Sequence, residues 1–337
     1  MSYEQYRPTG FRMLPPVVKN ILIISGLLFL ATFGLGKAFN INLMEILGMH
    51  YFAASEFSPY QLVTYMFMHG SFSHILFNML AFWMFGYVLE NVWGSKRFLI
   101  FFLVTGLGAA MIQMLVFYFQ TAPVLEAIDA YKQAPSALAF KSFIESGDFQ
   151  VVSSGIQDHF QSFQGKYNGM LMQADTLADQ ARMNLESIGG LKSQLALYPE
   201  AADSLNHQID LLNSQAQQMQ HQSDSISRQS LVATMDFMNT YREDFLNAPL
   251  VVGASGAVFG ILLAFGMMFP NTRIYLYFFI PIKAKWFVII YGGIELFFGV
   301  TDLPGDNVAH FAHLGGMLFG LGLILYWRYR SRRRFNP

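Results

Sequence analysis

Serine, histidine and asparagine side chains stand near the starts of three apolar segments of this 337-residue chain. Ser255 opens one segment, His313 lies near the start of another, and His74 and Asn78 lie near the start of a third. A serine hydroxyl is a weak nucleophile until an adjacent base removes its proton, and a neutral imidazole suits that task at neutral pH. The sequence therefore indicates acyl transfer, with Ser255 as nucleophile and His313 as base.

Attack of a serine on a carbonyl group places negative charge on the carbonyl oxygen, and preorganised hydrogen-bond donors must stabilise it. The Asn78 amide and the His74 ring are candidate donors, and their spacing of four residues puts them on one face of a helix. The backbone amides around Ala254 and Ser255, at the start of a predicted helix, are further candidates. These groups together would form an oxyanion hole.

Glycines accompany the candidate residues. Gly253 and Gly256 flank the serine and allow a tight backbone geometry there. Gly316 and Gly320 form the small-xxx-small pattern that lets two membrane helices approach closely. Each of these features alone is more often a packing device than part of an active site, but their joint occurrence with Ser255 favours catalysis.

The elements that must position these residues are long apolar segments. The chain is 53% hydrophobic and 13% charged, a composition typical of membrane proteins. A spanning helix needs about 20 mostly apolar residues, and the sequence therefore predicts an all-α membrane protein with six spans. The first span is not expected to be a cleaved signal peptide, because Pro15, Pro16 and Lys19 precede it and no clear small-residue cleavage site follows it. The six segments are residues 20–36, 72–92, 98–119, 252–269, 285–300 and 308–327.

The lysines and arginines predict the orientation of these spans. Thirteen of the fourteen basic residues outside residues 121–250 fall on the cytoplasmic side if the N-terminus is inside, and only Lys37 falls outside. Five arginines between Arg328 and Arg334 follow the last span. We expect both termini in the cytoplasm, with a bacterial inner membrane as the simplest location. The starts of the second, fourth and sixth spans then share the extracytoplasmic side, where the candidate residues can meet.

A polar segment, residues 121–250, separates the third and fourth spans. Its apolar residues recur at steps of three and four in two stretches, as a helix–helix seam requires, and Gly189, Gly190 and Pro199 between them would break a continuous helix. We predict that the chain has three parts. Residues 1–120 contain three spans, residues 121–250 form an extracytoplasmic helical hairpin, and residues 251–337 contain three spans and a basic tail. The predicted seam contains Tyr167, Met170, Ala174, Leu177, Ala181, Ile188, Leu205, Ile209, Leu212, Ala216, Met219 and Ile226.

The role of this insert stays open between a spacer, a gate for substrates and a self-association device. No cofactor or metal is expected. The chain has no cysteine, and His159, His207 and His221 of the insert are too dispersed to predict a metal site.

The motifs together resemble those of the rhomboid family of intramembrane serine proteases, over all six spans. The family's H-x-x-x-N reads His74 to Asn78, its G-x-S-G reads Gly253 to Gly256, and its H-x-x-G-x-x-x-G reads His313, Gly316 and Gly320. Glu90 and the residues from Trp93 to Arg97 also resemble the region that joins its second and third spans. The resemblance implies a compact six-helix bundle with an active site below the outer membrane surface.

In chemical terms, the resemblance implies an endopeptidase that cleaves transmembrane helices near their extracytoplasmic ends. An acyl-enzyme would form on Ser255, with His313 as the only partner and no third acidic residue. We accordingly expect no carboxylate to orient His313. Phe259, one turn after Ser255, would stack against the imidazole and hold it.

Two departures from the family pattern stand out: the long insert, and Tyr60-Gln61 where many members have a Trp-Arg pair in the first outer loop. His310, three residues before His313, is an alternative base, although the spacing to Gly316 and Gly320 favours His313.

Two other functions compete with proteolysis. A pseudoprotease would bind membrane clients without cutting, but such proteins usually lose one of the catalytic residues. A transporter is disfavoured because no internal repeat or pair of intramembrane carboxylates is evident.

Overall fold

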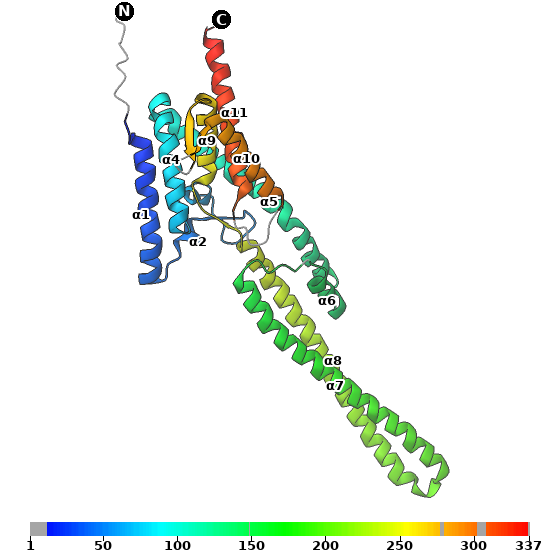
Figure 1. Cartoon of the computed structure of the whole chain (residues 1–337). Helices are drawn as coiled ribbons and strands as arrows, with labels where there is room; N and C mark the ends of the chain where they lie inside the picture. The colour runs from blue at the N-terminus through cyan, green and yellow to red at the C-terminus, as the bar shows by residue number, and fades with distance from the viewer. Residues whose placement is uncertain (1–11, 148, 277–279, 302–307, 336–337) are drawn as a thin grey trace, which may run out of the picture. The chain divides into compact units, whose positions relative to one another are not determined.

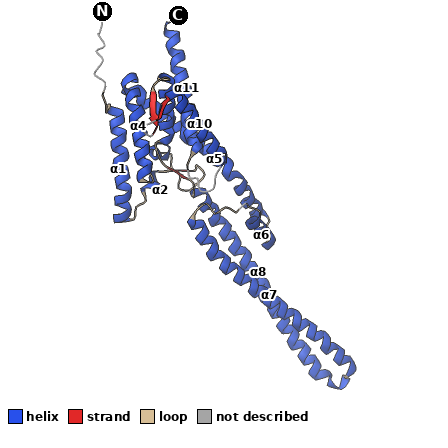
Figure 2. Ribbon diagram, in the orientation of Figure 1, coloured by secondary structure: helices blue, strands red, loops and turns tan. Residues whose placement is uncertain are grey.

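The computed structural model describes residues 12–147, 149–276, 280–301 and 308–335. Helices dominate, and the described strands form two short antiparallel pairs (Figure 2). The chain divides into two compact units, one of residues 1–120 with 249–337 and one of residues 121–248. The first unit holds all the candidate catalytic residues.

Five helices of the described chain are long and apolar enough to cross a membrane. They are α1 (Pro16–Phe39), α4 (Phe72–Trp93), α5 (Ser95–Gln133), α10 (Ala284–Thr301) and α11 (His310–Phe335). Large apolar side chains on α1, α4 and α10 are exposed, as lipid-facing side chains should be. The chain is thus an all-α membrane protein, as predicted.

The fourth predicted span, residues 252–269, forms a shorter helix, α9 (Ser255–Met268), of 14 residues. At 1.5 Å per residue it is about 21 Å long, against about 30 Å for the hydrocarbon core. It is shorter than predicted because Leu250 and Val251 form a strand and the positive φ of Gly253 (+120°) keeps the residues before Ser255 out of the helix. Ser255 therefore begins the helix.

The helices of the first unit run alternately along a common direction. The start of α1 and the end of α11 lie at one end of the unit, and the starts of α4, α9 and α11 lie toward the other (Figure 1). The core between them is rich in aromatic residues, among them Phe82, Phe98, Phe101 and Phe102, which are fully buried. This arrangement brings the polar starts of α4, α9 and α11 to the same end.

Glu90 joins three helices at the opposite end of α4. Its carboxylate accepts hydrogen bonds from the backbone N–H groups of Val17 (2.9 Å) and Val18 (2.8 Å) and from the hydroxyl of Ser95 (2.6 Å). The first N–H groups of a helix lack partners within the helix, and a carboxylate there also suits the helix dipole. Glu90 therefore caps α1 and fixes it to the junction of α4 and α5.

The segment between α1 and α4 contains α2 (Leu43–Leu47), β1 (Met49–His50), α3 (Gln61–Thr64) and the 3₁₀ turn η1 (Tyr65–Phe67). Gln61 is almost fully buried within it. Its side-chain oxygen accepts from the backbone N–H of Ser58 (3.1 Å), and its nitrogen donates to the carbonyls of Glu56 (3.0 Å) and Ile46 (3.3 Å). The neutral amide of Gln61 thus holds this loop together by three hydrogen bonds.

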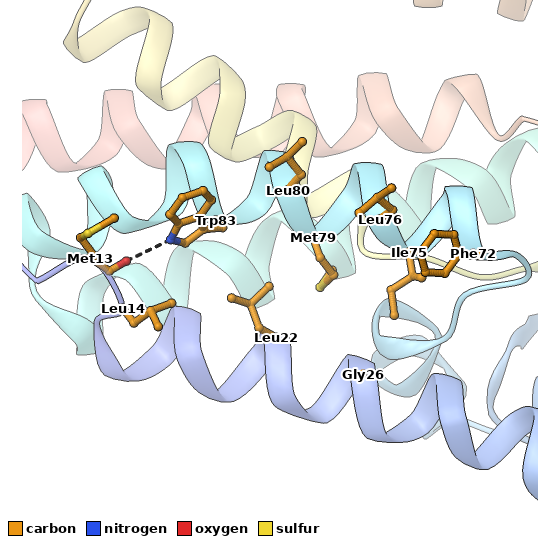
Figure 3. A pocket seen from close by; sticks show the side chains of 10 residues that line it. All are labelled: Met13, Leu14, Leu22, Gly26, Phe72, Ile75, Leu76, Met79, Leu80 and Trp83. Carbon is orange, nitrogen blue, oxygen red and sulfur yellow. Dashed lines mark hydrogen bonds between the residues drawn. The ribbon is translucent and has the colours of Figure 1, made fainter.

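An apolar groove lies between α1 and α4 (Figure 3). At one end, the indole N–H of Trp83 donates to the carbonyl of Met13 (3.0 Å). None of the candidate catalytic residues lines this groove. Its lining residues are Met13, Leu14, Leu22, Gly26, Phe72, Ile75, Leu76, Met79, Leu80 and Trp83.

The second unit contains the end of α5, α6 (Ala137–Glu145), α7 (Ser154–Leu197), the turn η2 (Pro199–Ala201) and α8 (Ala202–Asn247). Helices α7 and α8 form an antiparallel hairpin (Figure 1), which confirms the predicted helical hairpin. The prediction was wrong about Gly189 and Gly190, which lie inside α7 with open space around them. The chain turns at Pro199, where the missing N–H and the ring end the helix.

The seam of this hairpin repeats every seven residues. Small side chains occupy several of its buried positions: Ala174 and Ala181 on α7, and Ala216, Ser223 and Ser230 on α8. The Ser223 hydroxyl donates to the Ala174 carbonyl across the seam (2.8 Å). A seven-residue repeat of this kind is typical of coiled-coil pairing, and the seam is satisfied within one chain.

A separate aromatic cluster supports the unit near the ends of α7 and α8. Phe140 of α6 packs edge-on against Phe237 of α8, with ring centroids 5.9 Å apart, and Phe163 of α7 stacks on Phe237 at 4.5 Å. The hydroxyl of Tyr131 is hydrogen-bonded to that of Thr234. The second unit thus has a core of its own.

Candidate active site

The backbone before Ser255 is fixed on two sides. Strand β2 (Leu250–Val251) pairs with β1 in the register Met49↔Val251, and the N–H of Gly253 donates to the carbonyl of Tyr65 (2.9 Å). Gly253 has a φ of +120°, which a side chain would strain. The chain then enters α9 with Ser255 half-buried at its first position.

The close approach of α9 and α11 places His313 beside this helix start. A Cβ atom on Gly316 would lie 1.8 Å from the Gly256 carbonyl oxygen, and one on Gly260 would lie 2.8 Å from the Gly316 carbonyl oxygen. One on Gly320 would lie 3.3 Å from Gly260 Cα. The two backbones therefore approach closely along this line, and a side chain at Gly316 or Gly260 would overlap the facing helix.

The imidazole of His313 lies flat on the ring of Phe259, with centroids 4.3 Å apart and an interplanar angle of 8°. Phe259 and Ser255 are four residues apart on α9, so they share a face of that helix. His313 is therefore held on the face that carries Ser255. Within the described chain, no hydrogen bond joins the two side chains, and catalytic contacts often tighten only when substrate binds.

The polar face of α4 borders the same place. A Cβ atom on Gly253 would lie 2.7 Å from Nε2 of His74 and 3.7 Å from the amide nitrogen of Asn78. Ala254 is fully buried in the core, and the amide of Ser255 is one of the helix N–H groups without an intrahelical acceptor.

His69 adds a further imidazole that the motif analysis did not assign. It is buried beside His74, with ring centroids 5.1 Å apart. Its Nδ1 atom contacts the Phe67 carbonyl (3.3 Å), while its Nε2 atom has no partner in the described structure. Burial, with a smaller contribution from His74, lowers the pKa of His69 to about 4. His69 is therefore neutral at pH 7.

The expectation that no carboxylate orients His313 is wrong. Oε2 of Glu295, on α10, lies 2.8 Å from Nδ1 of His313 and 2.6 Å from Nδ1 of His310. Glu295 falls within the predicted span 285–300, but the sequence does not determine how α10 is rotated against α11. The general rule that an intramembrane acid has a nearby partner was the signal that could have found this contact.

Glu295, His310 and His313 also offer ligand atoms that a divalent metal could use. One atom from each lies within 4.8 Å of the others, and this is the one such group in the described ranges of the chain. Imidazole nitrogens and carboxylate oxygens are ligands that zinc accepts. A metal there would compete with the hydrogen bonds between these three side chains.

The rhomboid domain family matches residues 56–124 and 228–330, which together make up just over half of the chain. The two matched ranges include His74, Asn78, Ser255 and His313, and they leave out the distal part of the helical hairpin. Among curated proteins, none matches the chain with significance. Because the match covers the helices that carry the candidate site and just over half of the chain, this multi-pass membrane protein belongs to the rhomboid family.

Proposed function

We propose that this protein is an intramembrane serine endopeptidase that cleaves transmembrane helices of other membrane proteins near their extracytoplasmic ends. The observation that carries the proposal is the contact of α9 with α11, which holds the His313 ring against Phe259, one turn from Ser255. His74 and Asn78 approach the same place from α4. This arrangement supplies a nucleophile, a base and donors for a developing oxyanion.

In the first half of the reaction, the Ser255 hydroxyl attacks the substrate carbonyl while Nε2 of His313 takes its proton. The negative charge that forms on the carbonyl oxygen would be met by the Asn78 amide, the His74 ring and the backbone amides at the start of α9 around Ala254. His313 then gives the proton to the leaving amine. The C–N bond breaks and the acyl group stays on Ser255 as an ester.

In the second half, His313 removes a proton from a water molecule, which attacks the ester carbonyl. The resulting tetrahedral species collapses, the new carboxyl product leaves, and the proton returns to the oxygen of Ser255. The enzyme regains its starting state with no cofactor. The half-buried position of Ser255 is compatible with access of water to this step.

The short α9 supports a site below the membrane surface. A helix of about 21 Å cannot reach across a hydrocarbon core of about 30 Å, so its first residue lies within the membrane thickness if its other end reaches the surface. The basic residues support cytoplasmic termini and an extracytoplasmic insert. A bacterial inner membrane is the location that we infer from this pattern.

The test is cleavage of a tagged reporter with one transmembrane helix by the full-length protein in liposomes. The wild type should produce two fragments with a cut near the extracytoplasmic end of the reporter helix. Ser255→Ala and His313→Ala should each abolish cleavage, while thermal stability shows that they remain folded. Absence of cleavage by the wild type, even with reporters whose helices unwind readily, would favour a pseudoprotease that binds clients.

A further inference from the structure

The carboxylate of Glu295 contacts Nδ1 of His313, the ring nitrogen that faces away from the reaction when an acid orients a catalytic histidine. We propose that Glu295 is the positioning residue of a Ser255–His313–Glu295 triad. This inference rests on the proposed protease function and goes beyond the two-residue site that the sequence predicted. Triads of this kind are recognised by geometry and role rather than by fold or chain order.

The hydrogen bond determines which ring nitrogen of His313 can act as base. An ionised carboxylate can only accept, so Nδ1 of His313 carries the proton when it lies 2.8 Å from Oε2 of Glu295. The Nε2 atom on the far side of the ring then has the free lone pair that a base needs. Glu295 thereby selects the tautomer that can activate Ser255.

His310 supports the ionised form of Glu295. Its Nδ1 atom lies 2.6 Å from the same carboxylate oxygen, and its ring stacks on Phe298 of α10 at 5.8 Å. A buried carboxylate is costly unless it is paired or hydrogen-bonded, and two imidazole donors to one oxygen meet that need. His310 therefore holds the acid, while the acid holds His313.

Two restraints fix the His313 ring in different directions. The stacking on Phe259 sets the plane of the ring, and the hydrogen bond to Glu295 sets its rotation within that plane. Glu295 is itself buried, and α10 comes close to α11 nearby, where a Cβ atom on Gly299 would lie 3.2 Å from Cβ of His310. The acid is thus held by rigid helices rather than by a loop.

A structural role is the competing explanation, because the same contact also joins α10 to α11. The two roles differ in what they change. A positioning residue acts on the proton transfer, so its loss lowers kcat while KM stays near the wild-type value. A structural contact acts on stability and on the amount of folded protein.

The experiment compares kcat, KM and thermal stability of full-length wild type and Glu295→Gln with the reporter substrate. The glutamine amide keeps the size of the side chain, but it offers one acceptor and one donor group. Its carbonyl oxygen can still accept from both imidazoles, as Oε2 of Glu295 does, but the negative charge that stabilises the imidazolium formed during the reaction is lost. We expect kcat to fall by about 10²- to 10⁴-fold, with KM within about threefold of wild type.

A Glu295→Asp variant tests the same contact with the charge retained. Its side chain is about 1.5 Å shorter, and a misplacement of that size can cost up to about 10²-fold in rate. We expect kcat between those of wild type and Glu295→Gln. If Glu295→Gln does not fold, Glu295→Asp decides alone, and a kcat equal to wild type overturns the inference.

His310→Gln is the matched control on the other hydrogen bond. It leaves the Glu295–His313 contact in place, so the expected loss in kcat is at most about tenfold, far less than for His313→Ala. A loss as complete as that of His313→Ala would make His310 the base and would overturn the triad.

Two further outcomes keep the inference separate from the proposed function. An inactive wild type contradicts the protease proposal itself, whereas an active wild type with an equally active Glu295→Gln contradicts only the triad. A chelator should leave the activity of the wild type unchanged. Loss of activity on chelation, restored by Zn²⁺, would show that the three side chains hold a metal and would overturn the hydrogen-bonded triad.

Discussion

Asn78 and His74 offer side-chain donors from the same helix, yet their surroundings differ. Asn78 is buried, while His74 is half-buried and packs beside the ring of His69. An amide nitrogen donates without any change in protonation, whereas the histidine must carry its proton on the right nitrogen. Asn78 is therefore the more dependable donor to an oxyanion.

Asn78→Ala should lower kcat by about 10²-fold with little change in KM, because the amide would contact the oxyanion mainly in the transition state. Asn91→Ala, on the same helix at its other end, is the matched control and should retain the wild-type kcat. Steady-state cleavage of the reporter measures both. Equal rates in wild type and Asn78→Ala would exclude Asn78 from the oxyanion hole.

The buried His69 should make the free energy of unfolding of the protein decrease at acidic pH. Its pKa is about 4 in the folded protein, against about 6.5 in an unfolded chain. Below pH 6.5 the unfolded state therefore binds a proton that the folded state does not, so stability falls as the pH drops from 6.5 to 4. The loss should approach about 3 kcal/mol near pH 4.

Unfolding midpoints in detergent across this pH range should show a smaller decline for His69→Phe than for the wild type. His207→Phe, which alters an exposed histidine of the insert, should keep the wild-type decline. Parallel curves for wild type and His69→Phe would show that His69 is not buried in its neutral form.

At the residue scale, the types and spacings of Ser255, His313, His74 and Asn78 were enough to predict the chemistry. Glu295 and His69 were not assigned, for a physical reason. A hydrogen bond between side chains of different helices depends on how each helix is rotated, and an apolar segment exposed to lipid has no amphipathic pattern that reveals the rotation.

At the scale of elements, the line of contact between α9 and α11 is made of backbone. A Cβ atom on Gly256, Gly260 or Gly316 would overlap neighbouring atoms, and one on Gly320 would be in tight contact. The sequence predicted this approach from the spacing of Gly316 and Gly320. It did not predict that α9 starts only at Ser255, because the pairing of β1 with β2 involves residues about 200 positions apart.

Gly316→Ala should therefore separate the two helices and lower both stability and activity. A Cβ atom there would meet the Gly256 carbonyl at 1.8 Å, and overpacking of this kind costs about 1–3 kcal/mol or more. Gly322→Ala on the same helix has open space around it and should be neutral. Unfolding midpoints and reporter cleavage would decide; equal behaviour of the two variants would contradict the close packing.

At the scale of the whole molecule, the chain combines a rhomboid unit with a helical unit that has its own aromatic core. The sequence predicted the hairpin because its seven-residue seam is a local pattern. It did not predict α6 or the extension of α5 through Pro123 to Gln133, since a proline within a helix normally favours a break.

The buried seam of α7 and α8 is satisfied within one chain, so any self-association through the insert must use its outer faces.

Replacing residues 121–248 with a flexible linker of about 15 residues, which reaches about 20 Å, should leave the rhomboid unit folded. We expect the shortened protein to keep its unfolding midpoint within a few degrees. A lower oligomeric state after the replacement would assign self-association to the insert, and an unfolded product would show that the two units depend on each other.

The central claim is that His313 activates Ser255 as a nucleophile, and the most direct measurement is reaction of the full-length protein with a fluorophosphonate probe. The account predicts that the wild type is labelled on the peptide that contains Ser255, as mass spectrometry would show. Ser255→Ala and His313→Ala should not be labelled. Labelling of His313→Ala at the wild-type rate, or of Ser255→Ala on another residue, would contradict the claim.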